Sequence, residues 1–251
     1  MNKRYTQIFF AISLLLCIIG AGGVFAMEGA GTLERDEFAT PVGKVQLISV
    51  GHATLALQVG NLKIHIDPQT RYTDYSKWEK ADIILITHEH ADHLDMKAIQ
   101  MLSGPTTRLI TTQAVRDKIG QGEVLQHFQT LTHGPLSISA VPAYNTTPGR
   151  EMYHPKERKD NGYILSFGSF RIYVAGDTED IPEMASLGPI DVAFLPMNQP
   201  YTMTPQQVAS AARKIKPKIL YPYHYSSTNP QELVPLLAQE KNIEIRIRNL
   251  P

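Results

Sequence analysis

The chain has 251 residues, 43% of them hydrophobic, and its formal net charge is zero. This length suits a single α/β domain that can bury a sizeable core. The balanced charge argues against a nucleic-acid-binding surface and against an acidic disordered chain.

The start of the chain has the pattern of an export signal. Lys3 and Arg4 form a short basic region, and an apolar run from Ile8 to Ile19 follows it. The segment Val24-Phe25-Ala26 then offers the small residues that a signal peptidase accepts. We therefore expect residues 1–26 to be a signal peptide and the mature protein to be exported, either periplasmic or secreted.

Two alternatives to cleavage stay open. The uncharged run over residues 8–26 is long enough to span a membrane if it is not cut, and it would then anchor the protein. Cys17 is a second candidate, for lipidation, although lipoprotein processing favours a small residue before the cysteine and Leu16 is large. Because Cys17 is the only cysteine, the cleaved protein would have neither a disulfide nor a thiolate ligand.

The segment after the signal divides into a lead-in and a domain. Residues 27–41 contain glycines and mixed charges and predict a flexible N-terminal segment, whereas residues 42–251 form the predicted domain. Alternating apolar residues at its start predict three consecutive strands, over residues 44–50, 54–59 and 62–67. His65 lies within the third strand, and we interpret it as a strand residue and not as a ligand.

A histidine-rich loop follows the next apolar run. Residues 83–86 predict a buried strand, and His88, His90, Asp92 and His93 come directly after it. Imidazole and carboxylate are the ligands that zinc takes at about 2.0–2.2 Å. Side chains two residues apart in extended chain point the same way, so His88 and His90 can hold one ion together. Asp92 and His93 are sequence neighbours that project differently and suit a second ion. The loop therefore predicts a paired-metal site.

The rest of the chain alternates strands with helices. Apolar runs predict strands over residues 107–110, 136–141, 163–167, 170–174, 191–196, 218–221 and 243–248. Amphipathic patterns predict helices over residues 95–102, 113–119, 204–214 and 229–239. Residues 142–161 are polar without clear periodicity, which is typical of a binding loop or of disorder. We interpret His127 and His133 as structural residues.

The loop at residues 88–93 resembles the His-x-His-x-Asp-His motif of the metallo-β-lactamase superfamily. The resemblance continues, in order, through Gly51-His52-Ala53-Thr54, Ile66-Asp67-Pro68, His154-Pro155, Ala175-Gly176-Asp177-Thr178 and Pro222-Tyr223-His224-Tyr225. Together these motifs look like the branch that contains the ascorbate-phosphate lactonases and related metal-dependent hydrolases. The resemblance covers roughly residues 42–248 and implies an α/β fold, the αββα four-layer sandwich.

The resemblance also implies a ligand set for two divalent ions, zinc or alternatively manganese. The first ion would take His88, His90 and His154; the second would take Asp92, His93 and His224; Asp177 would bridge them. Asn145 stands where some relatives carry histidine, so either His154 or water completes the first shell. Five residues are expected in the second shell or at the substrate: His52, Asp67, Tyr144, Asn145 and Tyr225. Asp67 would orient a ligand histidine, although a loop-capping aspartate would look the same.

These ligands predict hydrolysis. Two cations about 3.5–4 Å apart share a water and lower its pKa, which gives a bridging hydroxide that attacks a carbonyl or phosphorus. Asp92 would also serve as the catalytic proton acceptor. We expect a metal-dependent hydrolase of a small ester, lactone or phosphodiester; the alternatives are an exported β-lactamase and a non-catalytic metal-binding protein.

The predicted partner is a small molecule. An anionic substrate is one candidate, because the long loop carries four cations, Arg150, Lys156, Arg158 and Lys159. No nucleic-acid partner is expected, and a membrane contact would involve only an uncleaved N-terminal segment. The sequence leaves the substrate, the native metal and the oligomeric state open.

Overall fold

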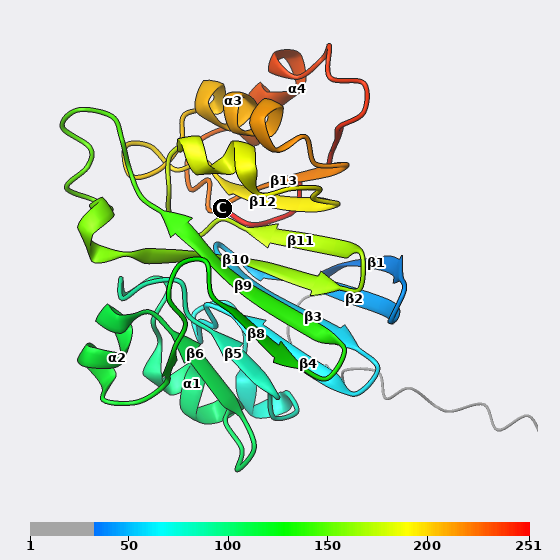
Figure 1. Cartoon of the computed structure of the whole chain (residues 1–251), viewed down its shortest axis with the longest axis vertical. Helices are drawn as coiled ribbons and strands as arrows, with labels where there is room; N and C mark the ends of the chain where they lie inside the picture. The colour runs from blue at the N-terminus through cyan, green and yellow to red at the C-terminus, as the bar shows by residue number, and fades with distance from the viewer. Residues whose placement is uncertain (1–32) are drawn as a thin grey trace, which may run out of the picture.

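The computed structural model describes residues 33–251, so the predicted signal peptide lies outside the described residues. Two seven-stranded sheets pack face to face, and the helices cover their outer faces (Figure 1). Helices α1 (Met96–Leu102) and α2 (Gln113–Ile119) lie on one side, and α3 (Pro205–Ile215) and α4 (Leu233–Leu236) on the other. The predicted αββα sandwich is confirmed. No helix within residues 33–251 has the length and apolar character needed to cross a membrane.

The first sheet contains the first seven strands in chain order. Its strands β1 to β4 are antiparallel and β4 to β7 are parallel; α1 connects β5 to β6 and α2 connects β6 to β7. The strands are β1 (Glu34–Thr40), β2 (Gly43–Gly51), β3 (Thr54–Val59), β4 (Leu62–Ile66), β5 (Ile83–Leu85), β6 (Arg108–Thr111) and β7 (Glu123–Val124).

The second sheet repeats this plan. Its strands β8 to β11 are antiparallel and β11 to β14 are parallel. The strands are β8 (Thr130–His133), β9 (Leu136–Ala143), β10 (Asp160–Phe167), β11 (Phe170–Val174), β12 (Val192–Pro196), β13 (Ile219–Tyr223) and β14 (Glu244–Ile245). Short 3-10 helices occur at Tyr75–Lys77, Lys156–Arg158, Pro182–Ser186 and Pro230–Glu232.

Both faces of the central strands are buried. Inward side chains such as Leu57 and Phe194 pack between the sheets, whereas outward ones such as Ile84 pack beneath the helices. On α3 the buried residues recur at the spacing of one helical face: Val208, Ala211, Ala212 and Ile215. Burying a side chain of the size of Val or Ile contributes about 1.5–3 kcal/mol, so this packing fixes both helical layers.

The direction of the parallel strands gathers polar residues at one edge. Ile66 of β4 pairs with Leu85 of β5, so the residues that follow these strands lie side by side. In the second sheet, β11 and β13 run parallel to β12 and end at the corresponding edge. Since α/β proteins place their sites at the carboxyl ends of parallel strands, this edge is the candidate site.

One expectation was wrong at the start of the domain. Residues 27–41 were expected to be flexible, but Glu34–Thr40 form β1, which pairs in register with β2. This strand contains several charged residues, so it lacks the alternation of apolar and polar residues that predicts a strand. One of these charged residues is Asp36, which forms ion pairs with Arg246 and Arg248 at the other end of the chain.

Two predictions near the C-terminus were too long. The helix expected over residues 229–239 is a 3-10 turn followed by the four-residue α4, which contains Pro235. A proline inside a helix removes a hydrogen bond and clashes with the preceding turn, which limits the helix. The strand expected over residues 243–248 pairs only at Glu244–Ile245.

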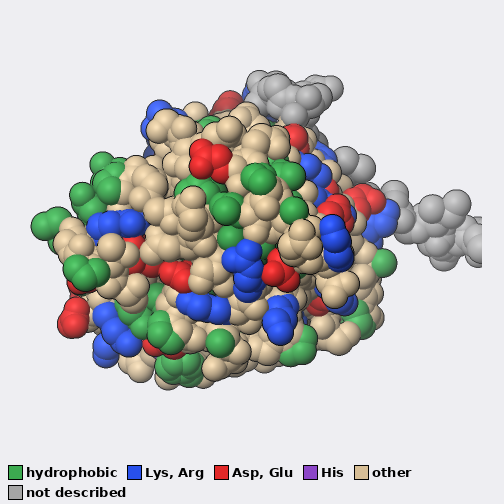
Figure 2. Space-filling model, turned by 90° about the horizontal axis from the view of Figure 1, so that it is seen from above, with side chains coloured by type: hydrophobic (Ala, Val, Ile, Leu, Met, Phe, Trp, Pro, Cys, Tyr) green, Lys and Arg blue, Asp and Glu red, His purple; other side chains and the backbone are tan. Residues whose placement is uncertain are grey.

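The outer surface mixes charges. The face in Figure 2 carries acidic and basic side chains next to one another, as the balanced composition predicts. Its middle contains both signs within a short distance, so this face is not dominated by either charge.

Candidate metal centre

Six of the nine histidines gather at the common edge of the two sheets. They come from four separate segments, so tertiary folding and not one motif builds the site. His52 lies in the β2–β3 turn, three follow β5, one lies in the β9–β10 loop and one follows β13; the last five are His88, His90, His93, His154 and His224.

The first group contains His88, His90 and His154, whose ligand atoms lie within 4.8 Å of one another. His88 and His154 are buried, and the Nε2 atom of each has no hydrogen-bond partner among the described residues. In both residues the other ring nitrogen, Nδ1, forms a hydrogen bond. His154 Nδ1 lies 3.1 Å from the carbonyl of Tyr201, which only accepts, so Nδ1 carries the proton. The lone pair of Nε2 is then free to bind a metal ion.

The tautomer of His88 follows from its neighbour Thr87. The Thr87 hydroxyl donates to Asp67 Oδ2 at 2.6 Å, so its oxygen is left to accept from His88 Nδ1 at 3.0 Å. Asp67 Oδ2 also accepts from His93 Nδ1 at 2.8 Å. These bonds hold Nδ1 of both histidines away from the site and point both Nε2 atoms into it. Asp67 is therefore placed as expected, behind a histidine of the site, where such carboxylates fix the orientation of metal ligands.

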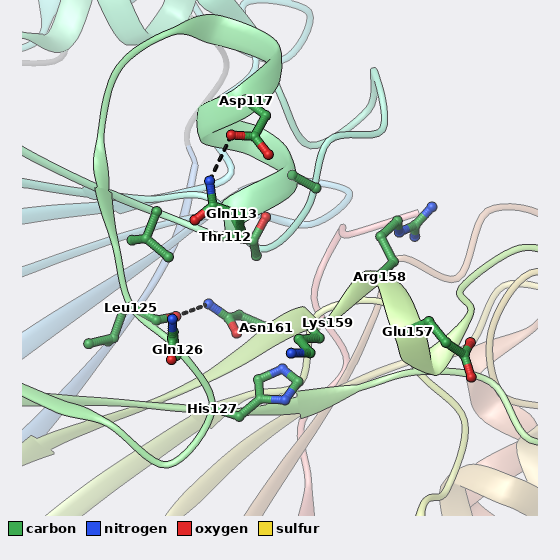
Figure 3. A pocket seen from close by; sticks show the side chains of 12 residues that line it. Thr112, Gln113, Asp117, Leu125, Gln126, His127, Glu157, Arg158, Lys159 and Asn161 are labelled. Carbon is green, nitrogen blue, oxygen red and sulfur yellow. Dashed lines mark hydrogen bonds between the residues drawn. The ribbon is translucent and has the colours of Figure 1, made fainter.

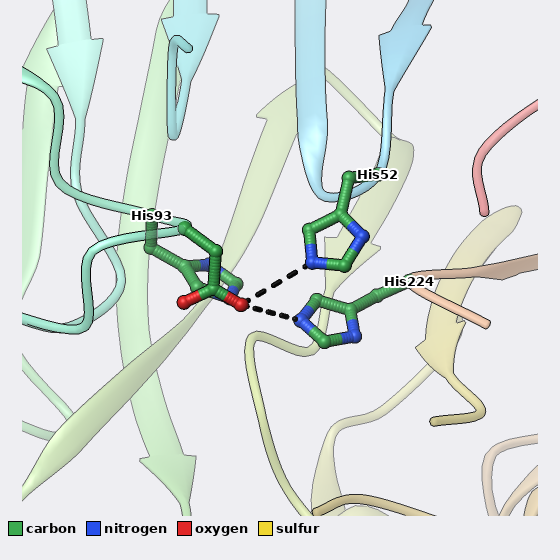
Figure 4. Close-up of side chains that lie close together, drawn as sticks. His52, His93 and His224 are labelled. Atoms are coloured by element: carbon green, nitrogen blue, oxygen red, sulfur yellow. Dashed lines mark hydrogen bonds and ion pairs between the residues drawn. The ribbon is translucent and has the colours of Figure 1, made fainter. Parts of the chain in front are cut away.

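The second group contains His52, Asp92, His93 and His224, again with ligand atoms within 4.8 Å of one another (Figure 4). Asp92 Oδ2 lies 3.3 Å from His52 Nε2 and 3.4 Å from His224 Nε2. His52 Nδ1 lies 2.6 Å from the backbone oxygen of Pro251, and its Nε2 faces the group. The sequence placed His52 near the metals but not among the ligands, and the structure adds it to the second group.

Asp177 lies between the two groups. Its Oδ2 is 3.3 Å from His154 Nε2 and 3.4 Å from His224 Nε2, and its Oδ1 is 3.4 Å from His93 Nε2. The backbone before Asp177 requires a glycine at position 176. Gly176 has φ +66°, and a Cβ there would lie 2.6 Å from the carbonyl oxygen of Asn161.

Burial and charge set the protonation of the site. Burial lowers the pKa of His88 well below its usual value and that of His90 to about 4, so both are neutral near pH 7. Burial acts in the same direction on His93, but the carboxylates of Asp177 and Asp67 outweigh it and raise the pKa. For Asp177 burial favours the neutral acid, yet the surrounding imidazoles lower its pKa well below the usual value.

The donor set fits divalent cations. A buried polar atom left without a partner costs about 1–3 kcal/mol, and this site gathers several such atoms, including the Nε2 atoms of His88, His93, His154 and His224. Neutral imidazoles around ionised carboxylates are the ligands that zinc and similar cations take. A bound cation would satisfy these atoms together.

His90 differs from the other histidines. Its Nε2 lies 2.8 Å from Nη1 of Arg158, which can only donate, so the lone pair of His90 faces Arg158. Arg158 also pairs with Asp160 and lies 3.4 Å from Glu89. His90 can bind an ion through Nε2 only if this arginine moves, or through Nδ1 if Nε2 takes the proton.

Three residues expected near the substrate have other roles or positions. The Tyr144 hydroxyl donates to Glu183, 2.9 Å away, and its ring packs in the core beneath α3. The Tyr225 hydroxyl donates to the carbonyl of Arg248. Asn145 approaches the centre but its amide donates to the carbonyl of Tyr201 at 2.7 Å, so it supports His154. The placement of Tyr144 corrects the sequence-based expectation, whereas the role expected for Tyr225 stays a prediction.

The cations of the long loop are mostly neutralised. Arg150 pairs with Glu179 and Lys156 with Glu183, in addition to the pairing of Arg158. These contacts weaken the argument from loop charge for an anionic substrate. Thr87 contacts Asp67, 20 residues away, and Arg158 contacts His90, 68 residues away, so no local spacing identifies these contacts.

A cavity of about 550 Å³ lies between the start of α2 and the segment that carries Arg158 (Figure 3). Arg158 lines it and also contacts His90. The remaining walls come from the start of α2, from residues 124–127 and from the start of β10, and include Gln113, His127, Lys159 and Asn161. This volume is within the range of small-molecule sites.

Comparison with known proteins agrees with this geometry. The β-lactamase superfamily domain matches residues 46–224. A metal-dependent hydrolase of Pyrococcus horikoshii is 30% identical over 224 residues, covering 80% of this chain and 96% of its own. One of Thermococcus kodakarensis is 28% identical over 221 residues, with the same coverage. The crystal structure of a candidate metal-dependent hydrolase from Parabacteroides distasonis has 50% identity and a TM-score of 0.85, over 88% of this chain and 100% of that one. The chain therefore belongs to the β-lactamase superfamily and is a metal-dependent hydrolase of that superfamily.

Proposed function

We propose that this hydrolase uses two divalent cations, zinc or manganese, to cleave a small ester, lactone or phosphodiester. The single observation that carries the proposal is the position of Asp177. The two oxygens of this buried carboxylate face different histidine groups: Oδ2 lies 3.3 Å from His154 Nε2, and Oδ1 lies 3.4 Å from His93 Nε2. Such a carboxylate is placed to offer one oxygen to each of two ions.

The proposed ligands follow the two groups. His88, His90 and His154 hold the first ion, Asp92, His93 and His224 hold the second, and Asp177 joins them. His52 is placed to contact the second ion as well, because its Nδ1 faces the backbone oxygen of Pro251 and its Nε2 faces Asp92. When bound, the cations polarise the substrate oxygen and activate a water as nucleophile.

Asp92 is the residue proposed to move the proton. Its side chain is 47% exposed, whereas that of Asp177 is buried, so Asp92 is the carboxylate that substrate and solvent can reach. Burial opposes ionisation of Asp92, but the neighbouring imidazoles of His224 and His52 lower its pKa below the usual value. An ionised, accessible carboxylate can accept a proton from the attacking water and pass it to the leaving group.

The rest of the substrate is proposed to occupy the cavity beyond Arg158. Arg158 lines the cavity and contacts His90, and polar side chains such as Gln113 and Asn161 share the lining with Leu125. A small, partly polar molecule suits this lining. The signal-like residues 1–26 support export of the protein, which we also propose.

Metal analysis combined with a substrate panel tests the proposal. Purified residues 27–251 should contain about two divalent ions per chain and should turn over at least one of p-nitrophenyl acetate, a γ-lactone and bis(p-nitrophenyl) phosphate. A protein that stays metal-free in micromolar zinc and manganese would contradict the metal assignment. Bound metal without turnover of the panel would support a non-catalytic role, and turnover of nitrocefin alone would support a β-lactamase.

A further inference from the structure

We propose that Arg150 is a positioning residue that holds His154 in the geometry and tautomer needed to bind the first ion. The inference rests on the proposed metal centre and extends it to a residue outside the ligand set. It starts from the carbonyl of Tyr201. This carbonyl accepts from His154 Nδ1 at 3.1 Å, and that bond directs His154 Nε2 towards Asp177.

The Tyr201 carbonyl is itself held in place. Asn145 donates its side-chain amide to the same oxygen at 2.7 Å, and its backbone amide donates to the carbonyl of His154 at 2.8 Å. Asn145 thus fixes the distance between His154 and Tyr201. These bonds lie within two loops, however, and neither loop belongs to a helix or strand at this point.

Arg150 joins the two loops. Its Nε donates to the carbonyl of Pro200 at 2.9 Å and its Nη2 donates to the carbonyl of Thr202, so its guanidinium group spans Tyr201 from both sides. The rigid, planar fork of arginine suits this double contact, because its donors are fixed relative to each other. A flexible lysine cannot span the two carbonyls in the same way.

Glu179 anchors the guanidinium group. Its Oε1 lies 2.9 Å from Arg150 Nη2, and its side chain is fully buried. The other oxygen, Oε2, accepts from the backbone amides of Thr146 and Thr147 at 2.8 and 2.6 Å. Glu179 lies two residues after Asp177, so the same ion pair ties the His154 loop to the segment that carries the bridging carboxylate.

The physical consequence concerns metal affinity. Without Arg150 the Tyr201 carbonyl loses its two flanking supports, and His154 is free to rotate or to adopt the other tautomer. Outer partners of metal-binding histidines typically change metal affinity about 10–100-fold when they are removed. The loss should affect the ion held by His154 and leave the other ion in place.

The experiment compares Arg150→Met and Arg150→Lys with the unaltered protein and with Arg213→Met. Arg213 pairs with Glu240 at 3.0 Å on the α3 side and serves as a control for the loss of an arginine ion pair. Zinc and cobalt titrations report each ion, and ¹⁵N NMR of the metal-free protein reports the tautomer of His154. The NMR measurement does not depend on metal binding, so it separates failure of this inference from failure of the proposed function.

Arg150→Met should weaken one ion about 10–100-fold, change the cobalt spectrum of that ion and lose the Nδ1-protonated form of His154. Arg150→Lys keeps a positive charge beside the buried Glu179, so it preserves the fold if Arg150→Met does not; its effect should be intermediate. Arg213→Met should match the unaltered protein. If Arg150→Lys binds both ions with unaltered affinity and keeps the Nδ1 proton, the inference is wrong, whatever the stability of Arg150→Met.

Discussion

Two buried histidines of the first sheet, His65 and His88, show that burial alone does not make a metal site. Both side chains are fully buried, and burial lowers the pKa of each. His65 lies within β4, where the rings of Tyr75 and Trp78 pack at 5.7 and 5.2 Å between centroids. His88 lies beyond the end of β5 and faces Asp177 at 3.8 Å.

The difference lies in what surrounds each ring. His65 is in an aromatic cluster under the helices, where its ring packs edge-on against Trp78. Around His88, by contrast, Thr87 and Asp67 fix the proton on one nitrogen and leave the other facing a carboxylate. A strand interior therefore makes a histidine structural, and the end of a parallel strand makes it a ligand candidate.

Asp177→Asn should have the largest effect on the edge site. The substitution keeps the shape of the side chain but removes the charge shared by both histidine groups, so affinity for both ions should fall by more than about 100-fold. Metal analysis after dialysis measures this. Asp191→Asn is the matched control, because Asp191 pairs with Lys218 before β12, away from the site. Equal metal contents in the two variants would contradict the bridging role.

The double variant His88→Ala, His90→Ala should lose one ion and keep the other. Only the first group loses its imidazoles, whereas His93 and His224 remain with Asp92. Inductively coupled plasma mass spectrometry should therefore find about one ion per chain. Two ions in the double variant would mean that these histidines do not hold the first ion.

His154→Ala should have a smaller effect on the same ion. Two imidazoles and Asp177 remain to bind that ion, so the affinity for it should fall about 10–100-fold. Competition with a zinc chelator measures the change. A variant that keeps both ions at full affinity and loses only substrate affinity would show that water, and not His154, completes the shell.

The smallest effect is expected at His65 and concerns stability. In the unfolded chain His65 takes up a proton near its ordinary pKa of 6.5, whereas burial lowers the pKa in the folded protein to about 3. Neutral His65 therefore supports the fold fully above pH 6.5, and this support is lost as the pH falls from 6.5 towards 3. The slope from this one group is at most about 1.4 kcal/mol per pH unit.

Urea unfolding of the metal-free protein between pH 7 and pH 4 measures that slope. His65→Leu should unfold with a shallower pH dependence than the unaltered protein and should bind zinc equally well. A variant with the same pH dependence would show that His65 is not protonated on unfolding in this range. A variant with weaker zinc binding would remove the distinction between His65 and the edge histidines.

Much of this architecture could be predicted from local patterns. The strand before His88 and the helix α3 have clear apolar periodicity, and Thr204 does cap α3 through a reciprocal bond with Gln207. Strand β1 could not be predicted in this way, because its charged residues are stabilised by arginines about 210 residues away. Such ion pairs join residues that are close in space but far apart in sequence, so local sequence patterns do not reveal them.

The site divides along the same line. Its histidines and Asp177 follow strand ends or stand in motifs, so the sequence singles them out. The place of His52 in the second group depends on a backbone oxygen 199 residues away. The proposed role of Arg150 depends on carbonyls 50 and 52 residues away. Tyr144 was expected at the site because it follows a strand, as the candidate ligands do, but its side chain packs in the core.

The position of the site between the two sheets has a thermodynamic consequence. Each proposed ion takes ligands from both sheets, since His88 and His93 follow β5 whereas His154 and His224 come from segments next to β9 and β13. An ion bound in this way links the sheets and is released when they separate. By mass action, a ligand at 100 times its dissociation constant stabilises the folded state by about 2.7 kcal/mol. The supply of metal would then set how often the sandwich opens, and with it the lifetime of the protein among proteases.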